Sequence, residues 1–191
     1  IAIAAAKAGK VVLCEKPLSP DSKECLAVID AEVKLGKRLV QIGFMRRFDP
    51  AYVEMKSALD NGLIGSALMM HNFHRNVSAP SNFTGQMAIS NSAPHEFDIA
   101  RFILGADYKS ISVFRPLGTG AGKPGAPVFR VVETTAGPLV NVEINNNAAY
   151  GYDVRGELVG AKGSVFLRAP GTSEIHVPLK QSTTYPADSR P

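Results

Sequence analysis

Residues 11–17 read Val-Val-Leu-Cys-Glu-Lys-Pro, a short apolar run that ends abruptly in a charged pair and a proline. An apolar run without polar alternation is typical of a strand that is buried on both faces of a parallel sheet. Pro17 cannot continue the hydrogen-bonded ladder, so the side chain of Lys16 is left at the carboxyl end of this strand. Open α/β sheets bind their ligands at that end, which makes Lys16 a candidate functional residue.

The sequence around this strand predicts the last part of a parallel, doubly wound sheet. Asp21-Ser-Lys-Glu24 has the spacing of a capping box, and apolar residues then recur at helical spacing until Gly36. Residues 38–44 form a second apolar run that suits a strand. Residues 1–44 therefore read helix, strand, helix, strand, which is typical of an α/β sheet.

From residue 45 onward the pattern changes to strands joined by short turns. Helices are expected over residues 51–60 and 94–104. The two-residue connections Ala136-Gly137 and Ala161-Lys162 favour antiparallel hairpins, because parallel strands need longer crossovers. Strands are expected at residues 65–75, 109–116, 127–134, 138–147, 152–160, 163–168 and 174–179. The expected fold class is thus α/β plus α+β, with a mostly antiparallel, open-faced sheet and helices on one of its faces.

Composition narrows the classes of partner. The formal charge of +4 comes from 21 basic and 17 acidic residues without a block of like charge, so nucleic acid is not an expected partner. Residues 1–9 are apolar but far too few to span a bilayer, and no membrane partner is expected. They read as the end of a helix without an initiating methionine, so we expect a fragment of a longer protein. The two cysteines favour a reducing compartment, and we predict a cytoplasmic location.

Four motifs occur in one order along the chain. They are Cys-Glu-Lys-Pro-Leu at 14–18, Gln-Ile-Gly-Phe-Met-Arg-Arg-Phe-Asp-Pro at 41–50, His-Glu-Phe-Asp at 95–98 and Tyr-Gly-Tyr-Asp-Val-Arg at 150–155. In this order they resemble the glucose-fructose oxidoreductase/inositol dehydrogenase/rhizopine catabolism (Gfo/Idh/MocA) family, and the second motif is similar to its inositol 2-dehydrogenase branch. The resemblance implies that residues 1–44 are the C-terminal remnant of a Rossmann-like dinucleotide-binding domain. It implies a substrate-binding and oligomerisation domain over residues 45–191.

The family resemblance implies an NAD-dependent oxidation of a secondary hydroxyl on a cyclic polyol or sugar, with NADP not excluded as the cofactor. Such a reaction needs a proton acceptor, and His95 suits this role because imidazole titrates near neutral pH. Lys16 can hydrogen-bond the substrate oxygen and stabilise a developing alkoxide. Asn91, four residues before His95, completes the expected catalytic set. Glu15, Lys16 and Pro17 are the expected contacts of the cofactor.

The same resemblance assigns a substrate pocket and an assembly. Substrate-binding roles fall on Met45, Arg46, His74 and Tyr152. Hydroxyls of a polyol that lose water on binding each need a polar partner, which such a set supplies. The family also implies a homo-oligomer, a dimer or a tetramer.

One position departs from the family. The inositol and sugar dehydrogenases usually have an aspartate where this chain has Asn91, and an amide keeps the shape of the side chain but loses its charge. Two other functions therefore stay open. One is a dehydrogenase of the same family that acts on an aldose or another sugar, and the other is a non-catalytic binding or oligomerisation protein. A solvated loop lysine and a helix-capping asparagine are the plain structural readings of Lys16 and Asn91.

Two further site types are not expected. Residues 118–125 look like a phosphate-binding loop, but Pro124 follows Lys123 and the next expected element is a strand. The Gly-x-Gly-x-x-Gly fingerprint after a first strand is also absent, so on the family reading it lies upstream of Ile1 and these residues alone should hold a dinucleotide poorly. No metal is predicted, because His71 and His74 fall on opposite faces of one expected strand.

Overall fold

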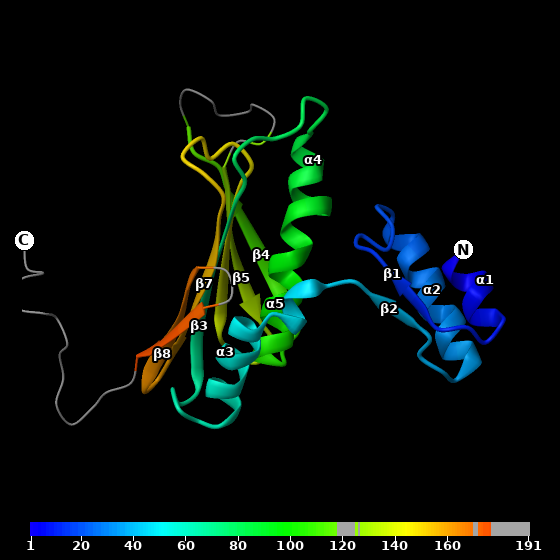
Figure 1. The fold of residues 1–191 in the computed structure, drawn as a ribbon, viewed down its shortest axis with the longest axis horizontal. Helices are drawn as coiled ribbons and strands as arrows, with labels where there is room; N and C mark the ends of the chain where they lie inside the picture. Colours follow the sequence, from blue (N-terminus) through cyan, green and yellow to red (C-terminus); the bar gives the residue numbers. More distant parts are fainter. Residues whose placement is uncertain (118–124, 126, 170–171, 177–191) are drawn as a thin grey trace, which may run out of the picture.

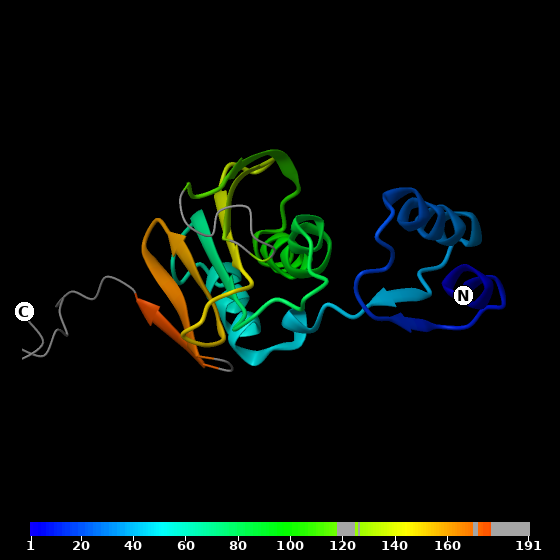
Figure 2. The ribbon, with the colours of Figure 1, turned by 90° about the horizontal axis from the view of Figure 1, so that it is seen from above.

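The computed structural model describes residues 1–117, 125, 127–169 and 172–176. Two parts follow each other along the long axis of the molecule, joined by the chain after β2 (Figures 1 and 2). The smaller, N-terminal part consists of α1 (Ala2–Lys7), β1 (Val12–Cys14), α2 (Ser22–Leu35) and β2 (Val40–Ile42). β1 and β2 pair in parallel, with Leu13 opposite Gln41, as the sequence predicted. The phosphate-loop-like stretch at 118–125 lies outside the described residues except for Gly125.

The burial predicted for the first strand is wrong. The side chains of Val11 and Leu13 are 81% and 74% exposed. In the described part of the chain the parallel sheet has only two strands, so β1 has a neighbour on one edge only. An apolar strand of this composition is thus present, but most of its apolar surface faces outward.

The apolar stripe predicted on the following helix is also mostly exposed. Asp21 caps α2 by accepting a hydrogen bond from the backbone N–H of Lys23, and Gly36 ends it with φ of 62°, both as the sequence indicated. Leu26, Ile29 and Val33, however, are each more than half exposed. α2 instead contacts α1 and buries Val28.

The larger part is an α+β unit. After the 3₁₀ turn η1 (Met45–Phe48) come α3 (Pro50–Asp60), β3 (Ala67–Arg75), α4 (Gly85–Met87), the π-helical turn η2 (Ala88–Ser92) and α5 (Ala93–Leu104). The remaining strands are β4 (Tyr108–Phe114), β5 (Val128–Thr134), β6 (Leu139–Asn145), β7 (Asp153–Gly160), β8 (Gly163–Ala169) and β9 (Thr172–His176). The expected strands are all found, except that the end of the last one, beyond residue 176, lies outside the described residues.

These strands form one sheet with the order β4-β5-β6-β3-β7-β8-β9. β3 and β6 pair in parallel, and every other pair of this sheet is antiparallel. Helices α3 and α5 pack on one face of the sheet and leave the other face open (Figure 2). The predicted fold class, a small parallel sheet followed by a mostly antiparallel, open-faced sheet with helices on one face, is confirmed.

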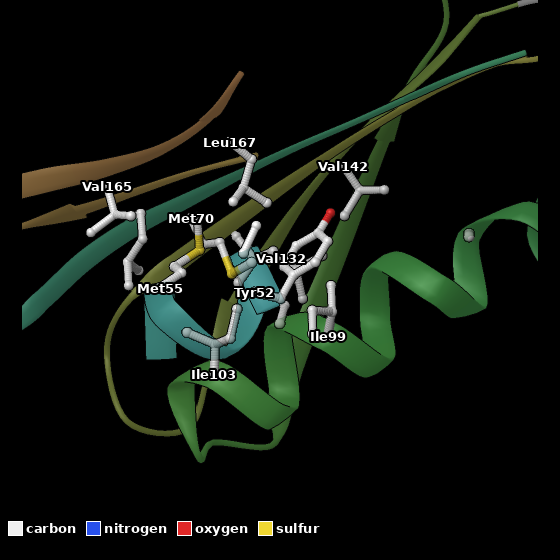
Figure 3. Packing of buried hydrophobic residues seen from close by; sticks show 14 of the residues in the cluster. Tyr52, Met55, Met70, Ile99, Ile103, Val132, Val142, Val165 and Leu167 are labelled. Carbon is white, nitrogen blue, oxygen red and sulfur yellow. The ribbon is translucent and has the colours of Figure 1, made fainter. Parts of the chain in front are cut away.

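The hydrophobic core lies between this sheet and its two helices (Figure 3). Met55 of α3, Met70 of β3 and Ile99 of α5 are each completely buried, and strands β6, β7 and β8 add valine and leucine side chains from the same face. Alternation along the strands explains this arrangement, since Val140, Val142 and Ile144 are all buried. The core holds α5 firmly against the sheet, and the start of α5 carries His95.

One glycine of the sheet is required by close packing. A Cβ atom at Gly160 would overlap the backbone oxygen of Ile64, which accepts a hydrogen bond from the backbone of Lys162. We expect Gly160→Ala to lower the free energy of unfolding by about 1–3 kcal/mol, the usual cost of overpacking. Urea unfolding followed by circular dichroism measures it. Gly85→Ala is the control, because a Cβ there meets no atom within 4 Å; an equal loss in both variants would refute the packing argument.

Candidate active site

The carboxyl end of β1 meets the segment that leads into α5. The Nζ atom of Lys16 donates a hydrogen bond of 2.8 Å to the backbone oxygen of Asn91. The peptide bond between Lys16 and Pro17 is cis. Burial lowers the pKa of the Lys16 ammonium; the charge of Glu15 opposes this shift, and nearby Arg46 adds to it. Two residues predicted to act together are thus brought together by the fold.

A break in helical geometry shapes this meeting point. Thr84 caps the single turn α4 by accepting a hydrogen bond from Met87, and residues 88–92 then follow as the π-helical turn η2. Such turns interrupt α-helices and are frequent at functional sites. Pro94 lies in the first turn of α5, where its missing N–H costs nothing. The result is a continuous helical segment in which Asn91 lies in the π turn and His95 in the first α turn.

His95 is buried, and one of its two ring nitrogens has no hydrogen-bond partner among the described residues. His95 is 7% exposed, and no described residue forms a hydrogen bond with its buried Nδ1 atom. The ring of Phe44 packs edge-on against it with centroids 6.5 Å apart, and the ring of His74 lies 6.2 Å away. Burial, followed by the charges of Lys16 and Arg46, lowers the pKa of His95 to about 4. The imidazole is therefore neutral at physiological pH and able to accept a proton.

This shift predicts a pH dependence of stability. The unfolded chain binds the His95 proton near pH 6.5, whereas the folded chain binds it only near pH 4. Between these values the unfolded state holds more protons, so the free energy of unfolding should fall as the pH falls through this window. A ¹H-¹⁵N NMR titration of His95 should give a pKa of about 4, and His95→Gln should remove this part of the stability profile. Titration of His95 near pH 6.5 would contradict the prediction.

Beside His95 lies a buried cluster of charged and polar side chains. Arg46, in the 3₁₀ turn after β2, forms an ion pair with Glu96 of α5, and both residues are almost fully buried. The Oε1 atom of Glu96 lies 2.6 Å from Nδ1 of His74, and the Nη2 atom of Arg46 lies 3.3 Å from the same ring nitrogen. Burial alone would raise the pKa of Glu96, but Arg46 and the hydrogen bond from His74 lower it below its usual range. Glu96 is thus an ionised carboxylate that joins two predicted substrate-binding residues.

The cluster continues from the other side of the His74 ring. Nδ2 of Asn76 lies 3.2 Å from Nε2 of His74 and donates a hydrogen bond of 2.7 Å to Oδ1 of Asn146. The hydroxyl of Ser92 donates to the same Asn146 oxygen at 3.2 Å. The network therefore runs from the 3₁₀ turn after β2, through β3, to the helical segment that holds Asn91.

The remaining predicted residues lie at the surface. Met45 and Tyr152 are 55% and 61% exposed, although Tyr152 is near enough to Arg46 to influence its pKa. The side chains of Glu15 and Pro17 are exposed at the end of β1. The carboxylate of Glu15 lies against Gly43, where a Cβ atom would approach it to 3.2 Å. These four residues are exposed, in contrast to the buried side chains of the cluster.

Sequence reasoning missed Glu96, Asn76, Asn146 and Phe44 as parts of the site. Glu96 offered the clearest signal, because it follows His95 directly and occupies a core position of an apolar helix. The two asparagines gave no signal in the sequence, since their contacts depend on the register of β3 and on the chain after β6. Phe44 read as the last apolar residue of a strand.

The described residues offer neither a metal site nor a membrane-spanning helix. Among the described residues, no group of three or more His, Cys, Asp or Glu side chains could hold a metal ion. His71 and His74 lie on opposite faces of β3, as the strand period predicted, and His71 contacts Asn141 instead. Within the described part of the chain, no helix is long and apolar enough to cross a membrane.

Comparison with known proteins agrees with this architecture. Residues 1–44 match the family model described as "Oxidoreductase family, NAD-binding Rossmann fold", and residues 52–166 match "GFO/IDH/MocA C-terminal domain". The chain is 50% identical over 173 residues to inositol 2-dehydrogenase 2 of Saccharopolyspora erythraea, covering 90% of this chain and 51% of that protein. It is 44% identical over 192 residues to inositol 2-dehydrogenase 1 of the same organism, covering 100% and 57%.

The solved structures include a similar fold. The crystal structure of myo-inositol dehydrogenase from Lactobacillus casei in complex with NAD(H) and myo-inositol is 29% identical, with a TM-score of 0.83 over 96% of this chain and 55% of that chain. The chain thus spans little more than half the length of the relatives that it matches. Because the C-terminal domain model alone covers more than half of the 191 residues, the chain belongs to the GFO/IDH/MocA oxidoreductase family.

Proposed function

We propose that this chain carries the substrate side of an NAD-dependent dehydrogenase that oxidises a secondary hydroxyl of a cyclic polyol, as an inositol 2-dehydrogenase does. The observation that carries the proposal is the placement of Lys16 at the carboxyl end of β1, within hydrogen-bond reach of the segment that leads to a neutral, buried His95. A cation and a proton acceptor at one point are what oxidation of an alcohol requires. The relatives named inositol 2-dehydrogenase support the choice of polyol.

In this proposal His95 accepts the proton of the reacting hydroxyl. Its lowered pKa keeps the ring neutral, and its Nδ1 atom has no partner among the described residues. Lys16 donates to the same substrate oxygen and stabilises the negative charge that develops on it. Asn91 holds Lys16 through its backbone oxygen, while its side chain accepts a hydrogen bond from Ser90.

The hydroxyls that do not react would contact the neighbouring cluster. Arg46 offers guanidinium donors and His74 a ring nitrogen within that cluster, while Met45 and Tyr152 would cover the substrate from the surface. A polyol needs several such partners, because each hydroxyl that loses water without a replacement costs binding energy. A site built this way should reject analogues that lack a hydroxyl.

The cofactor fits only in part. Residues 15–17 lie at the carboxyl ends of β1 and β2, where open α/β sheets bind nucleotides, and they could contact a nicotinamide ring beside Lys16. The ring, when bound, would accept the hydride from the substrate carbon. The letters Gly-x-Gly-x-x-Gly occur in the 191 residues only at Gly120–Gly125, which is followed by strand β5 and not by the helix that a pyrophosphate site needs. We therefore assign residues 1–44 to the nicotinamide side of a dinucleotide-binding domain.

The open sheet face and the two cysteines bear on assembly and location. We assign residues 45–191 to substrate binding and oligomerisation, because the open face of the sheet exposes Met69, Phe129 and Leu139. Apolar side chains on an open sheet face favour association with a second copy, as a homodimer or homotetramer. A cytoplasmic location is proposed from the two free thiols, Cys14 and Cys25.

The test is an assay of NADH formation at 340 nm with myo-inositol, scyllo-inositol and glucose. It uses the 191-residue chain and, in parallel, a chimera in which these residues replace the matching segment of Saccharopolyspora erythraea inositol 2-dehydrogenase 1, which aligns with the whole chain. We expect the chimera to reduce NAD with an inositol. Preference for glucose would favour a sugar dehydrogenase, and a folded chimera without turnover on any of the three would favour a non-catalytic protein.

A further inference from the structure

We propose that Glu96 is a positioning residue that fixes the protonation of the His74 ring, so that His74 presents a hydrogen-bond acceptor to the substrate. This inference rests on the proposed function in its reference to substrate. Its structural content, the tautomer of one histidine and the residue that sets it, stands on contacts within the chain.

The contacts around Nδ1 of His74 decide where the ring proton lies. Oε1 of Glu96 is 2.6 Å from this nitrogen, and Nη2 of Arg46 is 3.3 Å from it. The carboxylate of Glu96 is completely buried and is ionised, because it also pairs with Arg46. An ionised carboxylate can only accept a hydrogen bond, so the shorter contact with Glu96 places the proton on Nδ1. The longer contact with Nη2 of Arg46 is then not a hydrogen bond, because both nitrogens carry hydrogens. Nε2 of a neutral ring then has a lone pair.

The opposite side of the ring agrees with this assignment. The amide nitrogen of Asn76 lies 3.2 Å from Nε2, and an amide nitrogen can only donate. The same nitrogen donates its second hydrogen to Oδ1 of Asn146, which also accepts from Ser92. The bond between Asn76 and Nε2 has one donor and one acceptor only when Nε2 carries no proton. Glu96 at Nδ1 and Asn76 at Nε2 therefore favour the same tautomer of His74.

Arg46 and His74 would present a ligand with a fixed arrangement of hydrogen-bond donors and acceptors. Arg46 offers donors, whereas Nε2 of His74 offers an acceptor that is shared with Asn76. A hydroxyl group can accept from the first and donate to the second, but an O-methyl group can only accept. These two groups therefore favour a ligand with a free hydroxyl over one with an O-methyl group at the same place. Glu96 touches no ligand in this scheme and acts through Arg46 and His74.

The variant Glu96→Gln tests the proposal, because it should change the tautomer of His74. The guanidinium of Arg46 can only donate hydrogen bonds, so the oxygen of the glutamine amide must face it. The amide nitrogen then faces Nδ1 of His74, which becomes an acceptor and moves the ring proton to Nε2. The matched control is Asp98→Asn, which makes the same change two residues later on α5, in a carboxylate that pairs with Arg47.

The experiment is long-range ¹H-¹⁵N NMR of ¹⁵N-histidine in the 191-residue chain, which contains four histidines. We expect the Nδ1–H tautomer of His74 in the wild type and in Asp98→Asn, and the Nε2–H tautomer in Glu96→Gln. An Nε2–H tautomer in the wild type would overturn the proposal, as would an unchanged His74 spectrum in folded Glu96→Gln. If Glu96→Gln does not fold, the wild-type tautomer with Asn76→Leu, which should shift the Nε2 resonance alone, decides the question.

Failure of the proposed function can be told apart from failure of this inference. Addition of myo-inositol to the labelled chain should shift the His74 Nε2 resonance, and in the chimera Glu96→Gln should raise the KM for myo-inositol about tenfold while the KM for NAD is unchanged. The Nδ1–H tautomer without a myo-inositol shift or turnover would reject the polyol assignment and support the role of Glu96. A changed KM for NAD would overturn the assignment of Glu96 to the substrate side.

Discussion

Replacement of Arg46 by methionine is expected to lower the free energy of unfolding by about 3–5 kcal/mol. Arg46 and Glu96 are both almost fully buried, and methionine keeps the length of the side chain while removing the only guanidinium that pairs with Glu96 among the described residues. An ionised carboxylate left alone in the core must either lose its charge or open the structure to water. Urea unfolding at pH 7 measures the loss, and it should shrink at lower pH as Glu96 becomes protonated.

Two further variants separate charge from packing in this result. Arg101→Met removes an exposed ion pair with Asp107 and should cost less than about 1 kcal/mol. The double variant Arg46→Met/Glu96→Leu removes both buried charges and should recover much of the lost stability. If the double variant is less stable than Arg46→Met alone, the cost arises from packing and the charge argument fails.

Replacement of His95 by glutamine is expected to reduce kcat/KM for myo-inositol about 10²–10⁴-fold in the chimera, the usual contribution of a general base. Glutamine is similar in size and cannot accept a proton near neutral pH. The fold should be retained, because no described residue bonds the Nδ1 atom of His95. Initial rates of NADH formation across pH 5 to 10 measure the loss.

His71→Gln is the matched control for this prediction. His71 lies on the open face of the sheet and contacts Asn141, away from the cluster around His95. Its replacement should leave the rate within a factor of about two, as expected of a surface substitution. Retention of more than a tenth of the wild-type rate in His95→Gln would remove His95 from the role of base and leave Lys16 as the only ionisable candidate of the predicted catalytic set.

The order of the elements was predictable, and the exposure of the first part was not. Alternation along β6 and the turn at Ala136-Gly137 are local signals, so the hairpins of the large sheet followed directly from the sequence. An apolar run such as residues 11–14 indicates a strand but not how many neighbours it has. Burial of Leu13 depends on contacts that a local pattern does not contain, and the inference of a strand buried on both faces failed there.

Some residues of the candidate site could likewise be predicted from local sequence signals, and others could not. Lys16 and His95 were found because a strand end and a helix start are positions that the sequence marks. Glu96 was missed because a glutamate on the buried face of a helix is unfavourable unless it is paired, and its partners lie 50 and 22 residues away along the chain. The π-helical turn at residues 88–92 has no sequence signature of its own, so the placement of Asn91 within a continuous helical segment could not be anticipated.

The bond between Lys16 and Asn91 has a consequence for how the site tolerates change. The acceptor is the peptide oxygen of residue 91, which every amino acid possesses, and the ammonium has three hydrogens of which this bond uses one. The anchor of Lys16 is therefore independent of which side chain occupies position 91, whether the asparagine found here or the aspartate that the family resemblance leads us to expect. Substitution at this position can change the charge beside the reacting oxygen while the ammonium of Lys16 stays in place, because the main chain and not the side chain of residue 91 holds it.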